Sequence, residues 1–126
     1  MAFVVKMGTR GSVKKLECPN ILNKAAADNL LGCEALFPEN IVIKAASENK
    51  NYGELTVLFE DNHSREENSL AHYMLKRFFR VDMPRVLGAV IICGVGYTGG
   101  LTGLISEEAD YWLSMAGLVR KEYHLK

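Results

Sequence analysis

The sequence lacks the features that would assign the chain to a membrane or to a disulfide-bonded or zinc-bound class. None of its apolar runs approaches the roughly 18 residues of a membrane-spanning helix, and residues 1–6 lack the basic-then-apolar order of a signal peptide. Its three cysteines form no CxxC pair, which argues against a disulfide framework and against a zinc site. We therefore expect a cytoplasmic domain with structural cysteines and no bound metal.

The chain also lacks a net charge, because 15 basic residues are balanced by 15 acidic ones. A general binder of nucleic acid is basic overall, so nucleic acid is not the partner we expect. The charges are unevenly spread, however. Residues 28–67 carry nine acids against three bases, and residues 68–100 carry four bases against one acid. This distribution leaves room for a local basic surface that binds a small anion.

The length of 126 residues, with 48% hydrophobic and 24% charged residues, is typical of one globular domain. Apolar runs and alternation predict strands, and apolar residues at helical spacing predict three helices. The predicted strands cover residues 2–7, 12–17, 33–37, 41–46, 55–59 and 85–93, and the helices cover residues 20–31, 65–80 and 106–118. We therefore predict a single α+β domain over residues 1–126, with a mostly antiparallel sheet.

Residues that favour helix ends set these boundaries. Pro19 is expected to open the first helix and Gly32 to end it. Ser64 and Glu67 match an S-x-x-E capping box at the start of the second helix, and Ser106 is expected to cap the third.

The spacing of side chains predicts which surfaces are buried. On the second helix, one face is apolar and is expected to join the core, whereas a second face is cationic. The apolar face comprises Leu70, Met74 and Phe78, and the cationic face comprises His72, Lys76 and Arg80. Residues 87–93 are expected to form a buried central strand, and Trp112 and Tyr111 to pack in the core.

The most distinctive segment is glycine-rich and covers residues 94–103. Its first six residues match G-x-G-x-x-G, but no helix opens within the glycines and no strand with an acidic residue follows, so a dinucleotide-binding fold is excluded. Successive backbone N–H groups of such a loop can bind an anion. A flexible connection or a subunit contact would explain the same residues.

We predict that this loop contacts an anionic small molecule, with arginines nearby supplying charge-assisted hydrogen bonds. Tyr97 would stack on a base, and the threonine hydroxyls would bond phosphate or ribose. Glu107 and Glu108 would repel an anion at the start of the last helix, which puts the phosphate beside residues 94–99. The predicted ligand-binding residues are Gly96, Tyr97, Thr98, Gly99, Gly100, Arg77, Arg80 and Arg85.

No catalytic or metal-binding residue is assigned. The sequence contains no legible Ser-His-Asp order, paired-carboxylate motif or H-E-x-x-H, so a binding protein is favoured over an enzyme. His63 and Asp61 could hold a metal ion, but a turn before a helix is the favoured explanation of these residues.

Five segments form a pattern that spans most of the chain: Val13-Lys14-Lys15-Leu16-Glu17, Leu30-Leu31-Gly32, Glu34-Ala35-Leu36-Phe37-Pro38, Ile91-Ile92-Cys93-Gly94 and residues 101–108. Together they resemble a small uncharacterised domain family encoded by phages and mobile elements, relative to which residues 62–83 look like an insertion. The resemblance implies a phage or prophage gene, and thus a protein of the host cytoplasm, but it transfers no functional residue.

Small phage proteins without catalytic motifs often act by binding, and this analogy gives three hypotheses. The first is a counter-defence protein that sequesters a nucleotide-like immune signal without a cofactor. The second is an inhibitor that occludes a host protein, and the third is a small hydrolase or lyase acting on such a signal. We also expect a homo-oligomer, because short strands leave sheet edges to cover and because Tyr97, Leu101 and Leu104 offer apolar contacts.

Overall fold

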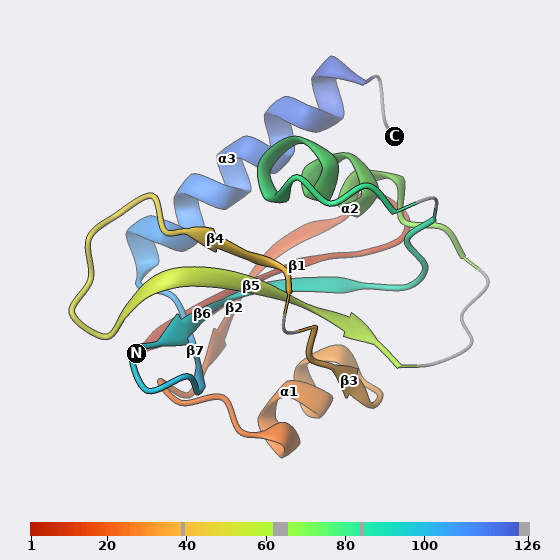
Figure 1. Ribbon diagram of the computed structural model, residues 1–126. Coiled ribbons are helices and arrows are strands. Elements are labelled where there is room, and N and C mark those ends of the chain that lie inside the picture. Colours follow the sequence, from red (N-terminus) through yellow and green to blue (C-terminus); the bar gives the residue numbers. More distant parts are fainter. Residues whose placement is uncertain (39, 62–65, 84, 124–126) are drawn as a thin grey trace.

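The computed structural model describes residues 1–38, 40–61, 66–83 and 85–123 (Figure 1). Within these residues, seven strands form one curled antiparallel sheet and three helices pack against it. In chain order, the elements are β1 (Ala2–Met7), β2 (Val13–Cys18), α1 (Lys24–Leu31), β3 (Ala35–Leu36), β4 (Val42–Lys44), β5 (Tyr52–Glu60), α2 (Ser69–Met74), η1 (Leu75–Phe79), β6 (Val90–Gly96), β7 (Leu101–Thr102) and α3 (Ser106–Glu122). The predicted fold class, a single α+β domain with a mostly antiparallel sheet, is confirmed.

The sheet has the order β2-β1-β6-β5-β3, with β4 also pairing with β5 and β7 also pairing with β6. The β1–β2 hairpin turns through residues 8–12, where Gly11 has a φ of 80° and the Gly8 N–H donates to the carbonyl of Ser12 at 2.8 Å. β6 lies in the middle, and its first half pairs with β1 while its second half pairs with β7. β6 therefore runs from the part of the sheet next to β1 to the part next to β7.

Both faces of the sheet are covered, and side chains alternate between them because of the two-residue period of a strand. Leu55, Val57 and Ile92 join the core under α2, η1 and α3. Leu58 and Ile91 join a second core between the sheet and α1. Figure 1 shows α1 beneath the sheet, with α2 and α3 above it.

The first helix begins later than the sequence predicts. Asn23 caps it by accepting a hydrogen bond from the Ala26 N–H at 2.8 Å, and Gly32 ends it as predicted, with a φ of 78°. Residues 20–22 are extended instead of helical, because they pair with β7. The Leu22 N–H donates to the carbonyl of Leu101 at 2.9 Å, so a tertiary pairing overrides the helix-opening preference of Pro19.

The second helix has a different cap from the predicted one. Asn68 is buried and accepts from the Ala71 N–H at 3.0 Å, whereas Glu67 instead pairs with Arg85. Ser64 lies outside the described residues. The helical segment, α2 followed directly by η1, covers residues 69–79 and is shorter than the predicted 65–80, mainly because it starts at Ser69. Its last turn (η1) is a π-helix, and the residue that follows it, Arg80, has a φ of 55°.

The residues of the two predicted faces of the second helix differ in exposure. Of the predicted cationic face, His72 is partly buried and Lys76 is exposed, whereas Arg80 lies just past the helical segment in the left-handed conformation and is exposed. The apolar face is confirmed. Leu70 and Met74 are buried, and Phe78 packs edge-on against Trp112, with ring centroids 5.4 Å apart.

The last helix runs further than predicted, to Glu122 instead of residue 118, and its N-cap is Ile105 instead of Ser106. Trp112 is buried as expected, but Tyr111 is exposed. The strand predicted over residues 85–93 begins only at Val90, and Leu87 is exposed. Leu87 instead makes an isolated bridge with Glu67, which explains why the strand starts later.

The three cysteines form no disulfide in the part of the chain that the structure describes. Cys93 is buried, and Cys18 and Cys33 are partly buried. Burial raises the pKa of the Cys18 thiol to about 11, so that it is protonated at neutral pH. It also raises the pKa of Cys93. These environments fit structural thiols.

Candidate functional site

The glycine-rich segment is mostly a β-hairpin and not an open loop. Gly94 and Val95 pair with Thr102 and Leu101, so the tip, residues 97–100, and the last residue, Gly103, lie outside the strands. The Gly96 N–H donates to the carbonyl of Gly100 at 2.7 Å, and the Gly99 N–H donates to that of Gly96 at 2.8 Å. Two of the backbone N–H groups that the sequence predicts to bind an anion, those of Gly96 and Gly99, therefore donate to carbonyls within the hairpin instead.

Two of the glycines have structural reasons to be glycine. Gly99 has a φ of 93°, a conformation that L residues with a Cβ rarely adopt. A Cβ at Gly94 would lie 2.6 Å from Thr102 Oγ1 and 3.1 Å from Tyr52 Cγ, so glycine is needed there for close packing. The sequence predicts that the glycines of this segment bind an anion, but at these two positions backbone geometry and packing require glycine.

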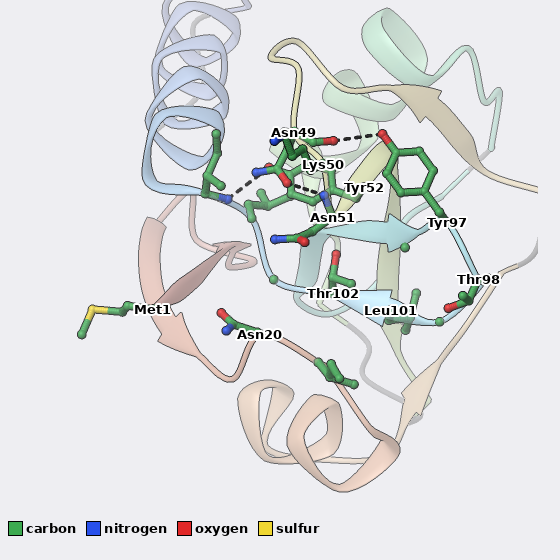
Figure 2. A pocket seen from close by; sticks show the side chains of 16 residues that line it. Met1, Asn20, Asn49, Lys50, Asn51, Tyr52, Tyr97, Thr98, Leu101 and Thr102 are labelled. Atoms are coloured by element: carbon green, nitrogen blue, oxygen red, sulfur yellow. Dashed lines mark hydrogen bonds between the residues drawn. The ribbon is translucent and has the colours of Figure 1, made fainter.

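A pocket of about 690 Å³ lies beside the hairpin. Its walls come from the hairpin, the β4–β5 loop, the extended segment before α1 and the residues between β7 and α3 (Figure 2). The lining residues with polar side chains are Asn20, Asn49, Lys50, Asn51, Tyr52, Tyr97, Thr98 and Thr102. Of the predicted site residues, Gly96, Tyr97, Thr98 and Gly100 line this pocket.

The wall formed by the β4–β5 loop is held at several points. The Tyr97 hydroxyl donates to the carbonyl of Asn49 at 2.9 Å, and the Asn51 N–H donates to Asn49 Oδ1 at 2.7 Å. The Ile105 N–H donates to the Tyr52 hydroxyl at 3.0 Å (Figure 2). Burial raises the pKa of Tyr52, which remains a neutral phenol at physiological pH. Hydrogen bonds thus join the hairpin, the loop and the start of α3 around the pocket.

The lining is polar but carries little charge. Lys50 is the one charged side chain among the described residues that line the pocket. The asparagine amides offer both hydrogen-bond donors and acceptors. Thr102 Oγ1 is buried and has no hydrogen-bond partner among the described residues. The pocket is therefore suited to a polar molecule with an anionic group near Lys50.

The structure does not bring the three predicted arginines to the hairpin. The Arg85 Nε donates to Glu67 Oε1 at 2.8 Å at the opposite end of β6, a strand whose seven residues span about 20 Å. Arg77 pairs with Glu122 at the C-terminal end of α3, about 25 Å along the helix from its start beside the pocket. Arg80 follows η1 and is exposed. Lys50, which the sequence analysis did not single out, is the cation at the pocket.

Glu108 is a further residue that the sequence analysis misjudged. Its carboxylate is fully buried, whereas Glu107 is exposed. It accepts hydrogen bonds from the Ala46 N–H at 3.1 Å, the Ser47 N–H at 2.9 Å, the Ser47 hydroxyl at 2.8 Å and Trp112 Nε1 at 2.8 Å. Its negative charge is therefore stabilised by hydrogen bonds from within the protein. The signal in the sequence was a glutamate four residues before the single tryptophan.

A second pocket, of about 490 Å³, lies on the α1 side of the same hairpin. Its lining is mainly apolar and has no charged side chain among the described residues. It includes Leu22, Phe37, Val42, Leu58 and Leu101. Gly99 and Gly100 also line it, so the hairpin separates a polar pocket from an apolar one.

The described residues contain no group of three or more His, Cys, Asp or Glu side chains placed to hold a metal ion. His63 lies outside them. No described helix is long and apolar enough to cross a membrane. No family model, curated protein or solved structure matches the chain significantly, so the resemblance to a phage-encoded family remains a prediction.

Proposed function

We propose that this protein is a non-enzymatic binding protein that sequesters an anionic, nucleotide-like small molecule in the polar pocket beside the β6–β7 hairpin. The observation that carries the proposal is the composition of that pocket. It combines one cation, Lys50, with three asparagine amides, an exposed tyrosine ring and an unpartnered threonine hydroxyl. Its volume of about 690 Å³ falls within the range of small-molecule sites.

Each feature of the pocket has a counterpart in a nucleotide. Lys50 would hold the phosphate as a point charge, and the amides of Asn20 and Asn51 would bond the ribose or the edges of the base. Tyr97 is 71% exposed and offers a ring on which a base can stack.

A thermal-shift screen with cyclic mononucleotides, cyclic dinucleotides and linear nucleotides tests the proposal. At least one phosphate-bearing ligand should raise the melting temperature, whereas the corresponding nucleoside should not. Mass spectrometry of the ligand recovered after incubation separates sequestration from catalysis. A binding protein returns the ligand intact, whereas a hydrolase or lyase returns a product. Counter-defence as the biological setting rests on the resemblance to the phage-encoded family and is part of the proposal.

A second candidate function is inhibition of a protein by occlusion, and the apolar pocket favours it. Phe37 and Val42, which line that pocket, are 39% and 41% exposed, and β4 pairs with β5 alone among the described strands. A partner strand that pairs with β4 would place a side chain over the pocket. Val42→Glu should abolish such an interaction and leave nucleotide binding unchanged.

We also propose that the protein self-associates, since β2, β3 and β4 each pair with only one other strand among the described elements and so leave sheet edges to cover. Leu104 does not offer the apolar contact that the sequence predicts, because it is fully buried in the core. Tyr97 is exposed and Leu101 is partly buried. Light scattering that gives a monomer mass at micromolar concentrations would exclude self-association.

A further inference from the structure

Glu108 is a buried carboxylate whose hydrogen-bond partners come from two different parts of the chain. A buried charge is costly unless donors surround it, and here four donors do. One donor, Trp112 Nε1, belongs to α3, and the other three belong to Ala46 and Ser47. The carboxylate therefore ties the start of α3 to the β4–β5 loop.

That loop forms one wall of the polar pocket. It is closed at its base by a hydrogen bond from the Ala45 N–H to the carbonyl of Gly53 at 3.0 Å. Ala46 and Ser47 follow this closure directly, and the pocket-lining residues Asn49, Lys50 and Asn51 come next. The two bonds to the Ala46 and Ser47 amides fix the backbone just before these three residues.

We propose that Glu108 is the positioning residue of the polar pocket. It sets the place of Asn49, Lys50 and Asn51, and it links occupancy of the pocket to α3 through Trp112. This inference rests on the proposed ligand-binding function. Trp112 fluorescence can report this coupling between the pocket and α3, because Trp112 is the single tryptophan of the chain. Its indole N–H donates to the same carboxylate oxygen as the Ala46 N–H. A ligand that moves the loop changes the hydrogen bonding of that indole.

Glu108→Gln is the decisive variant. It keeps the size of the side chain, but whichever way its amide is oriented, the NH₂ group faces a backbone N–H that the carboxylate had bonded. Ser47→Ala removes the hydroxyl bond to Glu108 and the contact of the same hydroxyl with Tyr52, and it keeps the two backbone amide bonds to the carboxylate. Glu107→Gln is the matched control, because it removes an exposed charge from the same helical turn.

Hydrogen–deuterium exchange without ligand measures the positioning alone. The amides of residues 46–51 should exchange about tenfold faster in Glu108→Gln, the effect of losing one hydrogen bond to a charged group. They should exchange at the parent rate in Glu107→Gln. Equal exchange in Glu108→Gln and the parent would overturn the positioning role, whatever the protein binds.

Titration with adenosine monophosphate and with a cyclic dinucleotide, followed by Trp112 fluorescence and by calorimetry, measures the link. Glu108→Gln should weaken binding about fivefold to tenfold at a temperature where it is fully folded, and Ser47→Ala about twofold to threefold. If the folded Glu108→Gln variant binds as tightly as the parent, the positioning inference is wrong and the proposed function stands. If the parent binds neither probe nor any other nucleotide, while residues 46–51 exchange faster in Glu108→Gln, the proposed function fails and Glu108 only anchors the loop.

Discussion

The hydroxyl of Tyr97 donates a hydrogen bond to the carbonyl of Asn49 at 2.9 Å, which joins the tip of the β6–β7 hairpin to the β4–β5 loop. The ring also lies against Gly53, where a Cβ would be 3.5 Å from Tyr97 Cε1. The side chain is nevertheless 71% exposed, so part of the ring is available to a ligand. Two walls of the polar pocket therefore meet at this residue.

Substitution of Tyr97 separates its hydroxyl from its ring. Tyr97→Phe removes the bond to Asn49 and should lower the free energy of unfolding by less than about 1 kcal/mol, since the bond is exposed. It should retain most of the affinity for a nucleotide. Tyr97→Ala should weaken that affinity about tenfold, because stacking on a base contributes about 1–3 kcal/mol. Equal affinities of the alanine variant and the parent would exclude a stacking role.

Substitution of Gly99 tests the geometry of the hairpin tip. Gly99→Val forces a β-branched residue to a φ of 93° and should lower the free energy of unfolding by about 1–2 kcal/mol or more. We expect the variant to fold, because nothing lies within 4 Å of the new Cβ, but to lose nucleotide binding as the tip rearranges. Gly100→Ala is the stability control, since it has neither a positive φ nor a close neighbour. Calorimetry that finds parental affinity in Gly99→Val would show that the tip takes no part in binding.

Asn68 should be among the residues whose loss destabilises the fold most. Its Nδ2 donates to the carbonyls of Met7 and Gly88 at 3.0 and 2.8 Å, and its Oδ1 caps α2. Asn68→Ala leaves these buried groups without partners and should lower the free energy of unfolding by about 2–4 kcal/mol in urea denaturation. Asn68→Asp should cost more at neutral pH, because a carboxylate oxygen would face two carbonyl oxygens. The exposed neighbour provides a control, and Ser69→Ala should change stability by less than about 0.5 kcal/mol.

Asp28 should contribute stability that disappears in acid. The hydrogen bond from the Ala35 N–H at 2.9 Å, supported by Lys24, lowers the pKa of Asp28 below its usual value of 3.8. A lowered pKa means that the contribution is complete above about pH 4 and is lost as the pH falls through the lower, folded-state value. The difference in urea midpoint between the parent and Asp28→Asn should therefore be largest near pH 6 and smaller near pH 2. A difference that grows on acidification would contradict this assignment.

The fold class was predictable because its signals are local. Apolar runs at strand spacing and apolar residues at helical spacing mark most elements, and Gly32 ends α1 as its position predicts. Helix starts were predicted less well, because long-range pairing decides them. Residues 20–22 are extended because β7 pairs with them, and Glu67 pairs with Arg85 instead of capping α2. Neither contact leaves a signal in the neighbouring sequence.

The candidate site was predictable only in part, for the same physical reason. The glycine-rich segment and Tyr97 stand out in the sequence, but the pocket also needs Asn20 and Lys50, which only the tertiary structure brings to it. The arginines were assigned on charge alone, although a seven-residue strand and a 17-residue helix separate Arg85 and Arg77 from the hairpin. Glu108 looked like a surface charge at the start of a helix, and only its burial reveals its function in holding the loop.

The most direct test of the account is a calorimetric titration of the parent and of Lys50→Gln with a series of nucleotides and the matching nucleosides. Lys50 is the charged side chain of the pocket, and its loss leaves the core untouched because it is exposed. The account predicts that at least one phosphate-bearing nucleotide binds the parent, that its nucleoside does not, and that Lys50→Gln binds the nucleotide about fivefold to tenfold more weakly. Binding that is equal in the two proteins, or no binding to the parent by any member of the series, would contradict it.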